Sequence, residues 1–400
     1  MWQQVKFKNL LNSEEGIRRG PFGSALRKEL FVQNSEYVVY EQQNAIYDHF
    51  NTRYRISEEK YHELKKFILL PGDFIMSGAG TIGKISLVPE GIEKGVFNQA
   101  LIRLRVNKNT DKEFFLQWMR SSEMQNKLTK ANPASAMVNL VPMSEVKEWD
   151  VIIPSLDEQS AIGSLFRTLD DLLASYKDNL ANYQSLKVTM LSKMFPKAGQ
   201  TVPEIRLDGF EEEWEEGTIG EFGSFYYGKS APKWSVTDEA TTPCVRYGEL
   251  YTKFSTKIDK IYSYTSIPKE NLKLSSGNEV LVPRVGENPL DFANCSWLSV
   301  KDVAIGEMIS VYNTPNNPLF IAYYFNAKMK KEFAKRVEGG SVANLYYTYL
   351  ENISISVPSL LEQQAIGAYF SNLDNLIAAH QEKISQLETL KKKLLQDMFV

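Results

Sequence analysis

The fold of this chain is decided by a stretch that occurs twice: IPSLDEQSAIGSLFRTLDDLLASYKDNLANYQSLKVTMLSKMF (residues 153–195) and VPSLLEQQAIGAYFSNLDNLIAAHQEKISQLETLKKKLLQDMF (residues 357–399). Pro154 matches Pro358, an offset of 204 residues. At that offset 18 of the 42 positions from Pro154 to Phe195 are identical, and no gap is needed. So long a period excludes a solenoid of small repeats and predicts a duplicated unit of about half the chain.

Each copy predicts a strand followed by a long helix. Pro154 and Pro358 end the strand-like runs WDVII and ISISV, because proline cannot donate to a sheet ladder. Apolar positions then recur at spacings of three and four, as in a coiled-coil seam. They are Leu169, Leu172, Tyr176, Leu180, Tyr183, Leu186, Met190 and Met194, then Leu373, Leu376, His380, Ile384, Leu387, Leu390, Leu394 and Met398.

The two helices have two possible partners. Each could pack on its own domain, which is the usual position of an amphipathic helix. Two matched stripes in one chain favour antiparallel pairing with each other, and such a pair would be a spacer of set length. Small polar residues near Thr168 and Ser371 predict a break at which a new helix is capped.

The glycine-rich stretch FIMSGAGTIGKISLVPEG (residues 74–91) contains G-x-x-x-x-G-K, which raises the question of a phosphate-binding P-loop. A P-loop requires a hydroxyl residue directly after its lysine, and here Ile85 follows Lys84. A helix should also begin at that lysine. Ile85, Leu87 and Val88 instead favour a strand, and Pro89 forbids a continuing helix. We therefore predict a strand, a glycine turn and a second strand, and no nucleotide hydrolysis.

Composition is that of a globular protein with two or three domains: 400 residues, 43% hydrophobic and 24% charged. No signal pattern or long apolar run is present, so we expect a soluble protein. The cysteines Cys244 and Cys295 are far apart, which excludes a disulfide framework and suits a reducing cytosol. Only three histidines, His49, His62 and His380, could contribute to a metal or catalytic site.

Charge is unevenly distributed along the chain. The net charge is −3, which argues weakly against nucleic acid as a partner. Residues 1–150 carry 21 basic and 18 acidic side chains, whereas residues 203–353 carry 16 basic and 21 acidic. Much of the acid lies in one run, GFEEEWEEG (residues 209–217), which we interpret as a solvated loop. A local basic face remains possible.

The regions between the helices are predicted to be α+β domains. Strand-like runs include EYVVY, FILL, DFIM, KISLV and ALIRLRV in the first region, and EVLVP, MISVY and ISISV in the second. Residues 110–128 and 316–337 have the apolar spacing of amphipathic helices. The duplication continues faintly here: MWQQVKFKNL resembles EWEEGTIGEF, and LPGDFIMSGAG resembles SSGNEVLVPRVGE. The shared parts are predicted to be scaffold, and the divergent parts to be what each domain recognises.

The doubled PSLxEQxAIG helix element resembles that of the specificity (S) subunit of Type I restriction–modification systems. IRRGPFGSAL, GTIGKISLVP and PEIRLDGFEEEWEEGTIGEF are similar to the same family, and the resemblance covers essentially the whole chain. It implies an α+β fold: two β-rich target-recognition domains, two long helices forming an antiparallel coiled-coil spacer, and an internal pseudo-twofold duplication. We expect domain 1 over residues 1–152, helical spacer 1 over 153–200, domain 2 over 201–356 and helical spacer 2 over 357–400.

The resemblance also implies a function. The chain would be a non-catalytic, cytoplasmic subunit whose two domains each read one half of a bipartite site in double-stranded DNA. Changing the helix length would change the spacing of the half-sites, as geometry sets spacing in symmetric DNA-binding dimers. Two modification subunits would bind S-adenosylmethionine and methylate adenine. Two restriction subunits would use ATP and Mg²⁺, and this chain itself would bind no cofactor, no metal and no membrane.

Candidate DNA-contacting residues are those that can read base edges, hold phosphates or stack on bases. In domain 1 they are Arg18, Arg19, Ser24, Arg27, Thr81, Lys84, Asn98 and Gln99. In domain 2 they are Tyr226, Tyr227, Lys229, Lys233, Trp234, Arg246, Tyr247, Arg284 and Asn288. Any one of these could equally be an ordinary surface or core residue.

The Glu-Gln pairs that open the repeats, Glu158–Gln159 and Glu362–Gln363, have two interpretations that could both hold. A carboxylate and an amide at a helix N-terminus favour capping. The second interpretation is that the pairs dock the modification subunits.

Two alternative functions remain. A stand-alone adenine methyltransferase should carry N-P-P-[YF], and the nearest match is NNPLF (residues 316–320), with Leu319 in place of the second proline. No convincing cofactor loop precedes it. The other alternative is a protein-binding spacer without DNA recognition, which the acidic composition mildly favours.

Overall fold

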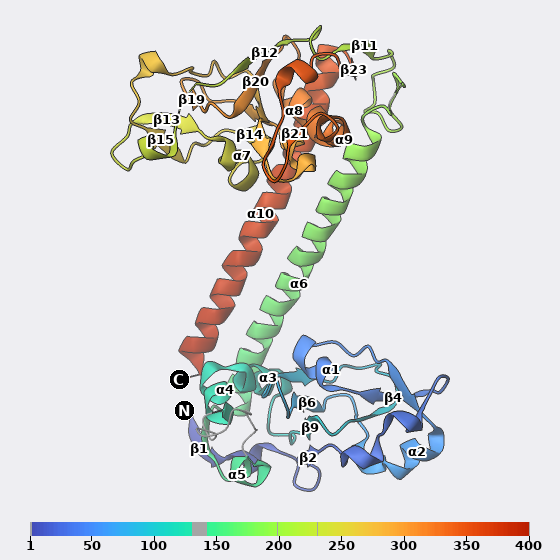
Figure 1. The fold of residues 1–400 in the computed structure, drawn as a ribbon. Coiled ribbons are helices and arrows are strands. Elements are labelled where there is room, and N and C mark those ends of the chain that lie inside the picture. Colours follow the sequence, from blue (N-terminus) through green and yellow to red (C-terminus); the bar gives the residue numbers. More distant parts are fainter. Residues whose placement is uncertain (1, 130–141, 198, 230, 400) are drawn as a thin grey trace. The chain divides into compact units, whose positions relative to one another are not determined.

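The computed structural model describes residues 2–129, 142–197, 199–229 and 231–399, and it divides into two compact units (Figure 1). Unit 1 comprises Met1–Lys177 and Glu382–Val400, and unit 2 comprises Asp178–Gln381. Each unit is therefore made of one domain together with parts of both long helices.

Unit 1 contains most of its strands in two small sheets. Its elements are β1 (Gln3–Lys6), η1 (Phe7–Leu10), β2 (Ile17–Arg19), η2 (Gly23–Ala25), η3 (Lys28–Leu30), β3 (Phe31–Val32), β4 (Tyr37–Tyr40), α1 (Gln42–Tyr47), β5 (Tyr54–Ile56), α2 (Glu58–Glu63), η4 (Lys65–Phe67), β6 (Phe74–Ser77), β7 (Ile85–Leu87), β8 (Gly95–Phe97), β9 (Leu101–Leu104), α3 (Lys112–Arg120), α4 (Ser122–Thr129), α5 (Met143–Lys147), β10 (Asp150–Ile153) and the first part of α6 (Leu156–Lys193).

Unit 2 repeats this plan with additional short strands. Its elements are β11 (Glu215–Thr218), β12 (Ser224–Tyr227), η5 (Lys233–Ser235), β13 (Thr242–Val245), α7 (Tyr247–Thr252), β14 (Lys257–Ile258), β15 (Ser263–Thr265), η6 (Lys269–Asn271), β16 (Glu279–Pro283), β17 (Val285–Gly286), η7 (Pro289–Ala293), β18 (Ser296–Leu298), β19 (Ala304–Ile305), β20 (Ile309–Asn313), α8 (Pro318–Lys328), α9 (Lys330–Ala334), β21 (Glu338–Gly339), β22 (Ala343–Asn344), η8 (Tyr347–Tyr349), β23 (Ser354–Val357) and the first part of α10 (Leu360–Met398).

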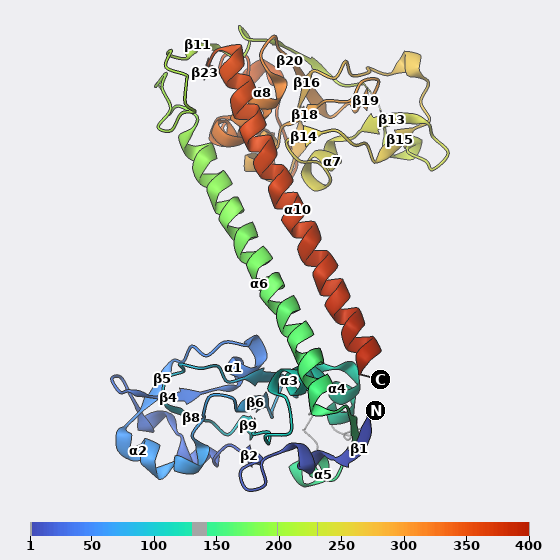
Figure 2. The ribbon, with the colours of Figure 1, turned by 180° about the vertical axis from the view of Figure 1, so that it is seen from behind.

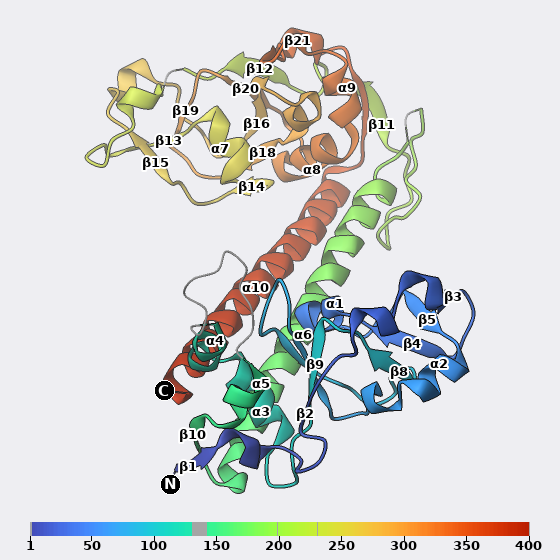
Figure 3. The same ribbon diagram turned by 60° about the horizontal axis from the view of Figure 1, so that its bottom comes forward.

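The sheets of the two units have matching topology. One sheet has the order β2-β9-β6-β7 in unit 1, and its counterpart in unit 2 has the order β12-β20-β16-β18-β14, where β12, β20 and β16 lie side by side (Figure 3). A second sheet in each unit contains a parallel pair, β4 with β8 and β13 with β19. The predicted strand–glycine turn–strand is confirmed, since β6 and β7 form an antiparallel hairpin.

One short strand pair closes each domain next to its long helix. Strand β1 pairs with β10, and β11 pairs with β23, both antiparallel over four residues. The partner strands β10 and β23 are the two that proline ends. Strand β23 leads directly into α10 (Figure 2), and β10 leads directly into α6 (Figure 3). The faint repeat between the two domain entries is thus confirmed.

Two local predictions were wrong. No break occurs at Thr168 or Ser371: α6 runs unbroken over 38 residues and α10 over 39. The hydroxyl of Thr168 instead donates to the carbonyl of Ser164 one turn earlier, so its hydrogen bond is made within the helix. The run FILL is not a strand, because it begins in the η4 turn and only Ile68 forms an isolated bridge.

The two long helices pair with each other in both units, and their order along the chain makes the pairing antiparallel. In unit 1 the first part of α6 contacts the last part of α10, where Lys391 bonds Asp170 at 2.5 Å. In unit 2 the last part of α6 contacts the first part of α10, where Lys187 bonds Asp374 at 2.5 Å. Asp374 lies 204 residues after Asp170, and Lys391 lies 204 residues after Lys187. The two ion pairs are therefore equivalent in the two repeats.

The carboxylates of these pairs also bond their own domains in the same way. Gln117 on α3 donates to Asp170 at 3.1 Å, and Tyr323 on α8 donates to Asp374 at 2.7 Å. Each aspartate therefore ties the helix that bears it to the domain it follows in the chain. The bound lysine comes from the other long helix.

The end of each long helix packs into the domain that it does not follow in the chain. Phe195, after α6, is buried in unit 2 against Trp214, Phe320 and Phe370. Phe399, after α10, is buried in unit 1 against Phe114 and Phe166. The duplicated halves thus exchange their helix ends.

Candidate nucleic-acid interface

Several candidates of domain 1 gather at one edge of the β2-β9-β6-β7 sheet, where strands β2 and β6 end. Strand β2 ends at Arg19 beside Ile102, and β6 ends at Ser77 beside Leu101. The loop before β9 and the β6–β7 turn therefore meet there, and the amide of Gly78 donates to the carbonyl of Ala100 at 2.8 Å. The register brings Arg19, Thr81, Lys84, Asn98 and Gln99 to this edge.

The loop after β2 lies flat on the neighbouring loop at Gly20. A Cβ added to Gly20 would stand 1.9 Å from the carbonyl oxygen of Asn98, so only glycine fits. Ser24, in η2, and Arg27 follow and are exposed. Arg18 is half-buried and paired with Glu15 at 3.3 Å, so its charge is already partly balanced.

The same edge of unit 2 has the same construction. Gly228 follows β12, and a Cβ on it would stand 2.1 Å from the carbonyl oxygen of Gly306. Strand β16 ends at Pro283, and the next residue, Arg284, donates its backbone amide to Met308 at 3.2 Å. The β12–η5 loop, the β19–β20 turn and Arg284 therefore lie together at this edge.

A cavity of about 260 Å³ opens at this edge of unit 2. Three of the candidates, Lys233, Arg246 and Tyr247, line it together with Glu307 and Met308. Lys233 comes from one stretch of the sequence and the consecutive residues Arg246 and Tyr247 from another, and the structure brings the two stretches together. Lys229, in the loop between them and β12, is exposed.

Aromatic rings and cations interleave beside this cavity. Lys273 lies over the ring of Tyr226 at 4.6 Å, and Arg284 lies over the ring of Tyr227 at 4.4 Å. Burial raises the pKa of Tyr226 to about 12, so its hydroxyl stays protonated. Lys273 was missed from the sequence. Tyr226 and Tyr227 were predicted as candidates because they lie near basic residues in the sequence.

Tyr346 and Tyr347 were also missed. Arg284 lies 5.4 Å from the ring of Tyr346, and Tyr347 packs at 4.6 Å on Tyr227. Both lie in the run NLYYTY (residues 344–349), which contains no basic residue.

Exposed aromatic side chains occur on the matching loops of both units. Trp234, in η5, is 74% exposed, and Phe22, which precedes η2, is 90% exposed. Phe22 was not among the candidates. The candidate Asn288 is already bonded within its own loop, because its side chain caps η7 and donates to Asp291. The structure therefore gives Asn288 a local role.

Three of the four Glu-Gln side chains are held inside their own unit. Gln159 accepts from the amide of Asp111, the cap of α3, and Gln363 accepts from that of Asn317, the cap of α8. Glu362 binds Arg206 through both oxygens and is 1% exposed. These three side chains are buried and bonded within the chain, and docking of the modification subunits through them stays a prediction.

Glu158 is the member of the two pairs that stays half-exposed. Its carboxylate accepts from the indole of Trp2 at 2.9 Å. The matching Glu362 is bound by Arg206, which is not the counterpart of Trp2, because the strand pairing aligns Trp2 with Trp214. Docking through Glu158 stays a prediction.

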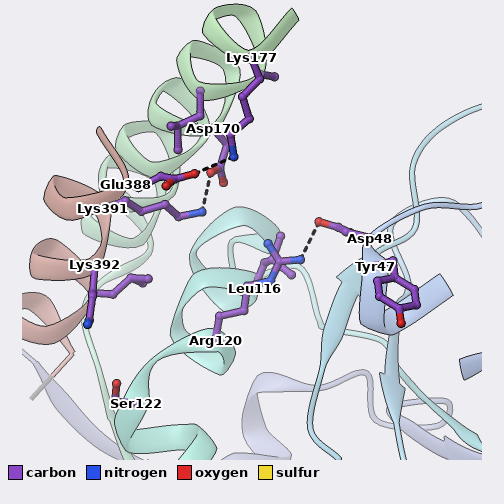
Figure 4. Close-up of a pocket in the computed structure, with 13 residues that line it drawn as sticks. Tyr47, Asp48, Leu116, Arg120, Ser122, Asp170, Lys177, Glu388, Lys391 and Lys392 are labelled. Carbon is purple, nitrogen blue, oxygen red and sulfur yellow. Dashed lines mark hydrogen bonds and ion pairs between the residues drawn. The ribbon is translucent and has the colours of Figure 1, made fainter. Parts of the chain in front are cut away.

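A larger cavity of unit 1, about 850 Å³, lies where α1, α3, α6 and α10 meet (Figure 4). Its charged side chains are mostly paired: Lys177 with Glu388, Lys391 with Asp170, and Arg120 with Asp48. Paired charges of both signs make this a structural junction of the helices.

Metal ligands, thiols and the NNPLF run are the features that bear on catalysis by this chain. The described residues contain no cluster of three His, Cys, Asp or Glu side chains that could hold a metal ion. Burial raises the pKa of Cys244 to about 11 and that of Cys295 well above its ordinary value, so both thiols stay protonated. In the NNPLF run, Asn317 caps α8 and Asn316 accepts from Gln363.

In the parts of the chain that the structure covers, each helix is too short or too polar to cross a bilayer.

The comparisons with known proteins agree on one family. The model of the Type I restriction modification DNA specificity domain matches residues 2–182 and again residues 211–389. The chain therefore belongs to the family of Type I restriction–modification specificity proteins, and it carries two copies of the specificity domain.

Two relatives are similar to this chain in sequence, and a solved structure is similar to it in fold. The putative Type I restriction enzyme MjaX specificity subunit of Methanocaldococcus jannaschii is 22% identical over 85% of this chain and 80% of its own length. The MjaVIII specificity subunit of that organism is 21% identical over 76% of this chain and 73% of its own. The crystal structure of an S subunit from M. genitalium superposes with a TM-score of 0.59 at 16% identity, covering 100% of this chain and 96% of that one.

Proposed function

We propose that this chain is the DNA-reading subunit of a Type I restriction–modification enzyme, in which each unit reads one half of a bipartite target. The observation that carries the proposal is the repeated sheet edge. Both units hold a glycine-anchored loop, a turn and exposed basic or aromatic side chains on one scaffold, whereas the residues at that edge differ. Two similar scaffolds with different reading residues suit two different half-sites.

The paired helices support the other half of the proposal. Each helix is tied to the domain that it follows by an aspartate and to the other domain by its phenylalanine end. Helices anchored at both ends fix their own register. We infer that they set the number of base pairs between the half-sites, and that their length determines it.

The chemistry would belong to partner proteins. We propose that two modification subunits bring S-adenosylmethionine and methylate adenine, that two restriction subunits use ATP and Mg²⁺, and that this chain is non-catalytic and cofactor-free. A subunit with this task acts in the cytoplasm, where the DNA is. A solved relative with a TM-score of 0.51 is described in work on complex assembly and conformational transition of the Type I R-M system, which supports assembly with partners.

The proposal is tested by mapping methylated adenines in cells that express the modification subunits with and without this chain. We expect one bipartite motif with a fixed gap, present only when this chain is present. Methylation by the chain alone would restore the methyltransferase alternative. Assembly with the partners but no sequence preference would favour the protein-binding spacer.

A further inference from the structure

We propose that Arg284 reads one guanine in the half-site of unit 2, and that Tyr227 and Tyr346 hold its guanidinium for that contact. This inference rests on the proposed function and deepens it by assigning a base to a residue. Arg284 was one of many candidates from the sequence, and the structure distinguishes it from the others by its surroundings.

The guanidinium of Arg284 is held by aromatic rings. Its Cζ lies 4.4 Å from the ring centroid of Tyr227 and 5.4 Å from that of Tyr346. A ring face attracts a cation and restricts a planar guanidinium by stacking. A side chain restricted in advance loses less rotamer entropy when it binds.

The two tyrosines are themselves fixed. Tyr227 ends β12, where it pairs with Ser310, and it packs on Tyr347 at 4.6 Å. Tyr346 packs edge-on against Tyr349, whose hydroxyl donates to Glu338 at 2.8 Å. The support of Arg284 is therefore built into the fold and does not depend on DNA.

The backbone of Arg284 is fixed from both sides. Its amide donates to the carbonyl of Met308 at 3.2 Å, and its carbonyl accepts from the amide of Leu345 at 2.8 Å. Arg284 thus stands between the turn before β20 and the segment after β22. Both the start and the end of this long side chain have set positions.

The hydrogen-bonding nitrogens of Arg284 have no carboxylate partner. Across the described residues, its guanidinium takes part in no ion pair and no hydrogen bond, and of its nitrogens only Nε is buried without a partner. By contrast, Arg206 is held by Glu362 and Arg336 by Glu332. The two Nη groups of Arg284 remain accessible as parallel donors.

Guanine is the base that this arrangement fits. In the major groove guanine presents two adjacent acceptors, O6 and N7, and a guanidinium fork binds both at once. Adenine offers one acceptor beside a donor, so a donor-only fork is mismatched there. A phosphate could also bind an arginine, but it would not require the fork to be held at one angle.

The matching position of unit 1 supports a role in specificity. Gly78 stands where unit 2 has Arg284, because each directly follows its strand, β6 or β16, and each donates its backbone amide to the facing loop, at Ala100 and at Met308 respectively. A residue of the shared scaffold would have a similar side chain in both halves. We expect no guanine contact from this position in unit 1.

The test maps methylated adenines in cells that express the modification subunits of this system with Arg284→Ala. We expect one position of one half-site, guanine in wild type, to accept other bases, with discrimination reduced about 10- to 100-fold. The other half-site and the gap stay unchanged. Arg336→Ala is the matched control, because its guanidinium is already bound to Glu332, and it leaves the motif unchanged.

Two further variants keep the test decisive. Arg284→Lys keeps the charge but loses the planar fork, so we expect the same relaxed base preference even if the alanine variant fails to fold. Tyr346→Phe keeps the ring and the preference, whereas Tyr346→Ala weakens the preference.

An unchanged motif with Arg284→Lys would overturn the inference, and so would a uniform loss of binding across all sequences, which indicates a phosphate contact. A wild-type motif without guanine in either half would overturn it too. Absence of any bipartite motif with wild type would instead overturn the proposed function.

Discussion

Two aspartates and two lysines record the duplication at the scale of single residues. Asp170 and Asp374 occupy the same position in the two repeats, and so do Lys187 and Lys391. Each lysine binds the aspartate of the other repeat, with side chains between 19% and 37% exposed. These ion pairs are sheltered enough to contribute more than an ordinary surface pair.

Replacing Asp374 by Asn should destabilise unit 2. Lys187 would lose its anionic partner in a place that is about three-quarters buried, and Tyr323 would keep only a neutral acceptor. We expect the free energy of unfolding to fall by roughly 1–2 kcal/mol, measured by urea denaturation. Lys177→Ala is the control: its pair with Glu388 is more than half exposed, so its effect should stay below about 1 kcal/mol. Equal effects would contradict this.

Replacing Glu15 by Gln should change how stability depends on pH. The hydrogen bond from buried Arg103 lowers the pKa of Glu15 below its ordinary value of 4.5. The folded state therefore favours the carboxylate, and this stabilisation is present above pH 4.5 and lost as the pH falls through the lowered pKa. We expect the variant to be less stable by roughly 1 kcal/mol at pH 7, because water screens the exposed side of Glu15.

The measurement for Glu15 is urea unfolding of both proteins between pH 7 and pH 3. The difference between them should shrink as the solution becomes acidic. A difference that grows toward pH 3 would show that the sign is wrong.

Elements were predicted well from the sequence where the pattern was long or bounded by proline. The strands before Pro154 and Pro358 and both long helices follow from such patterns. The break near Thr168 was wrong because capping signals are local. In the fold, buried Phe166 and Leu169 flank that position, so packing continues the helix through it.

The candidate site was only partly predictable for a related reason. Residue type and loop position identified Lys233, Arg246 and Tyr247, which share one cavity. Nothing in the sequence indicates which polar groups fold inward. Gln159 and Gln363 were therefore assigned to partner docking, although each bonds the N-terminal cap of a neighbouring helix.

The exchange of helix ends predicts that half of the chain forms a symmetric dimer. Residues 1–200 contain one domain, one long helix and both partners of the ion pair, Asp170 and Lys187. In a dimer, Phe195 of each copy could occupy the site that Phe399 fills against Phe114. We expect a stable homodimer in analytical ultracentrifugation.

Charge reversal checks the half-chain dimer without removing the domain. Asp170→Lys in residues 1–200 places two lysines together and should weaken the dimer at least about tenfold. Adding Lys187→Asp restores opposite charges and should restore association. If residues 1–200 stay monomeric at all concentrations, the proposed exchange of helix ends between two copies is contradicted.

At the scale of the whole molecule, the bulk charge was a poor guide. The net charge of −3 argued weakly against DNA, yet the edge of unit 2 that holds the candidate residues carries basic side chains over tyrosine rings. Acidic residues that lie elsewhere, such as the run at 209–217, dominate the sum. The duplication was the stronger signal, because it predicted two similar scaffolds with different surfaces.

The central claim is that each domain reads its own half of the target. The most direct measurement exchanges residues 1–150 for the corresponding domain of another family member and maps methylated adenines in the presence of the modification subunits. The account predicts that one half-site is replaced while the other half-site and the gap are retained. A simultaneous change of both half-sites would contradict it.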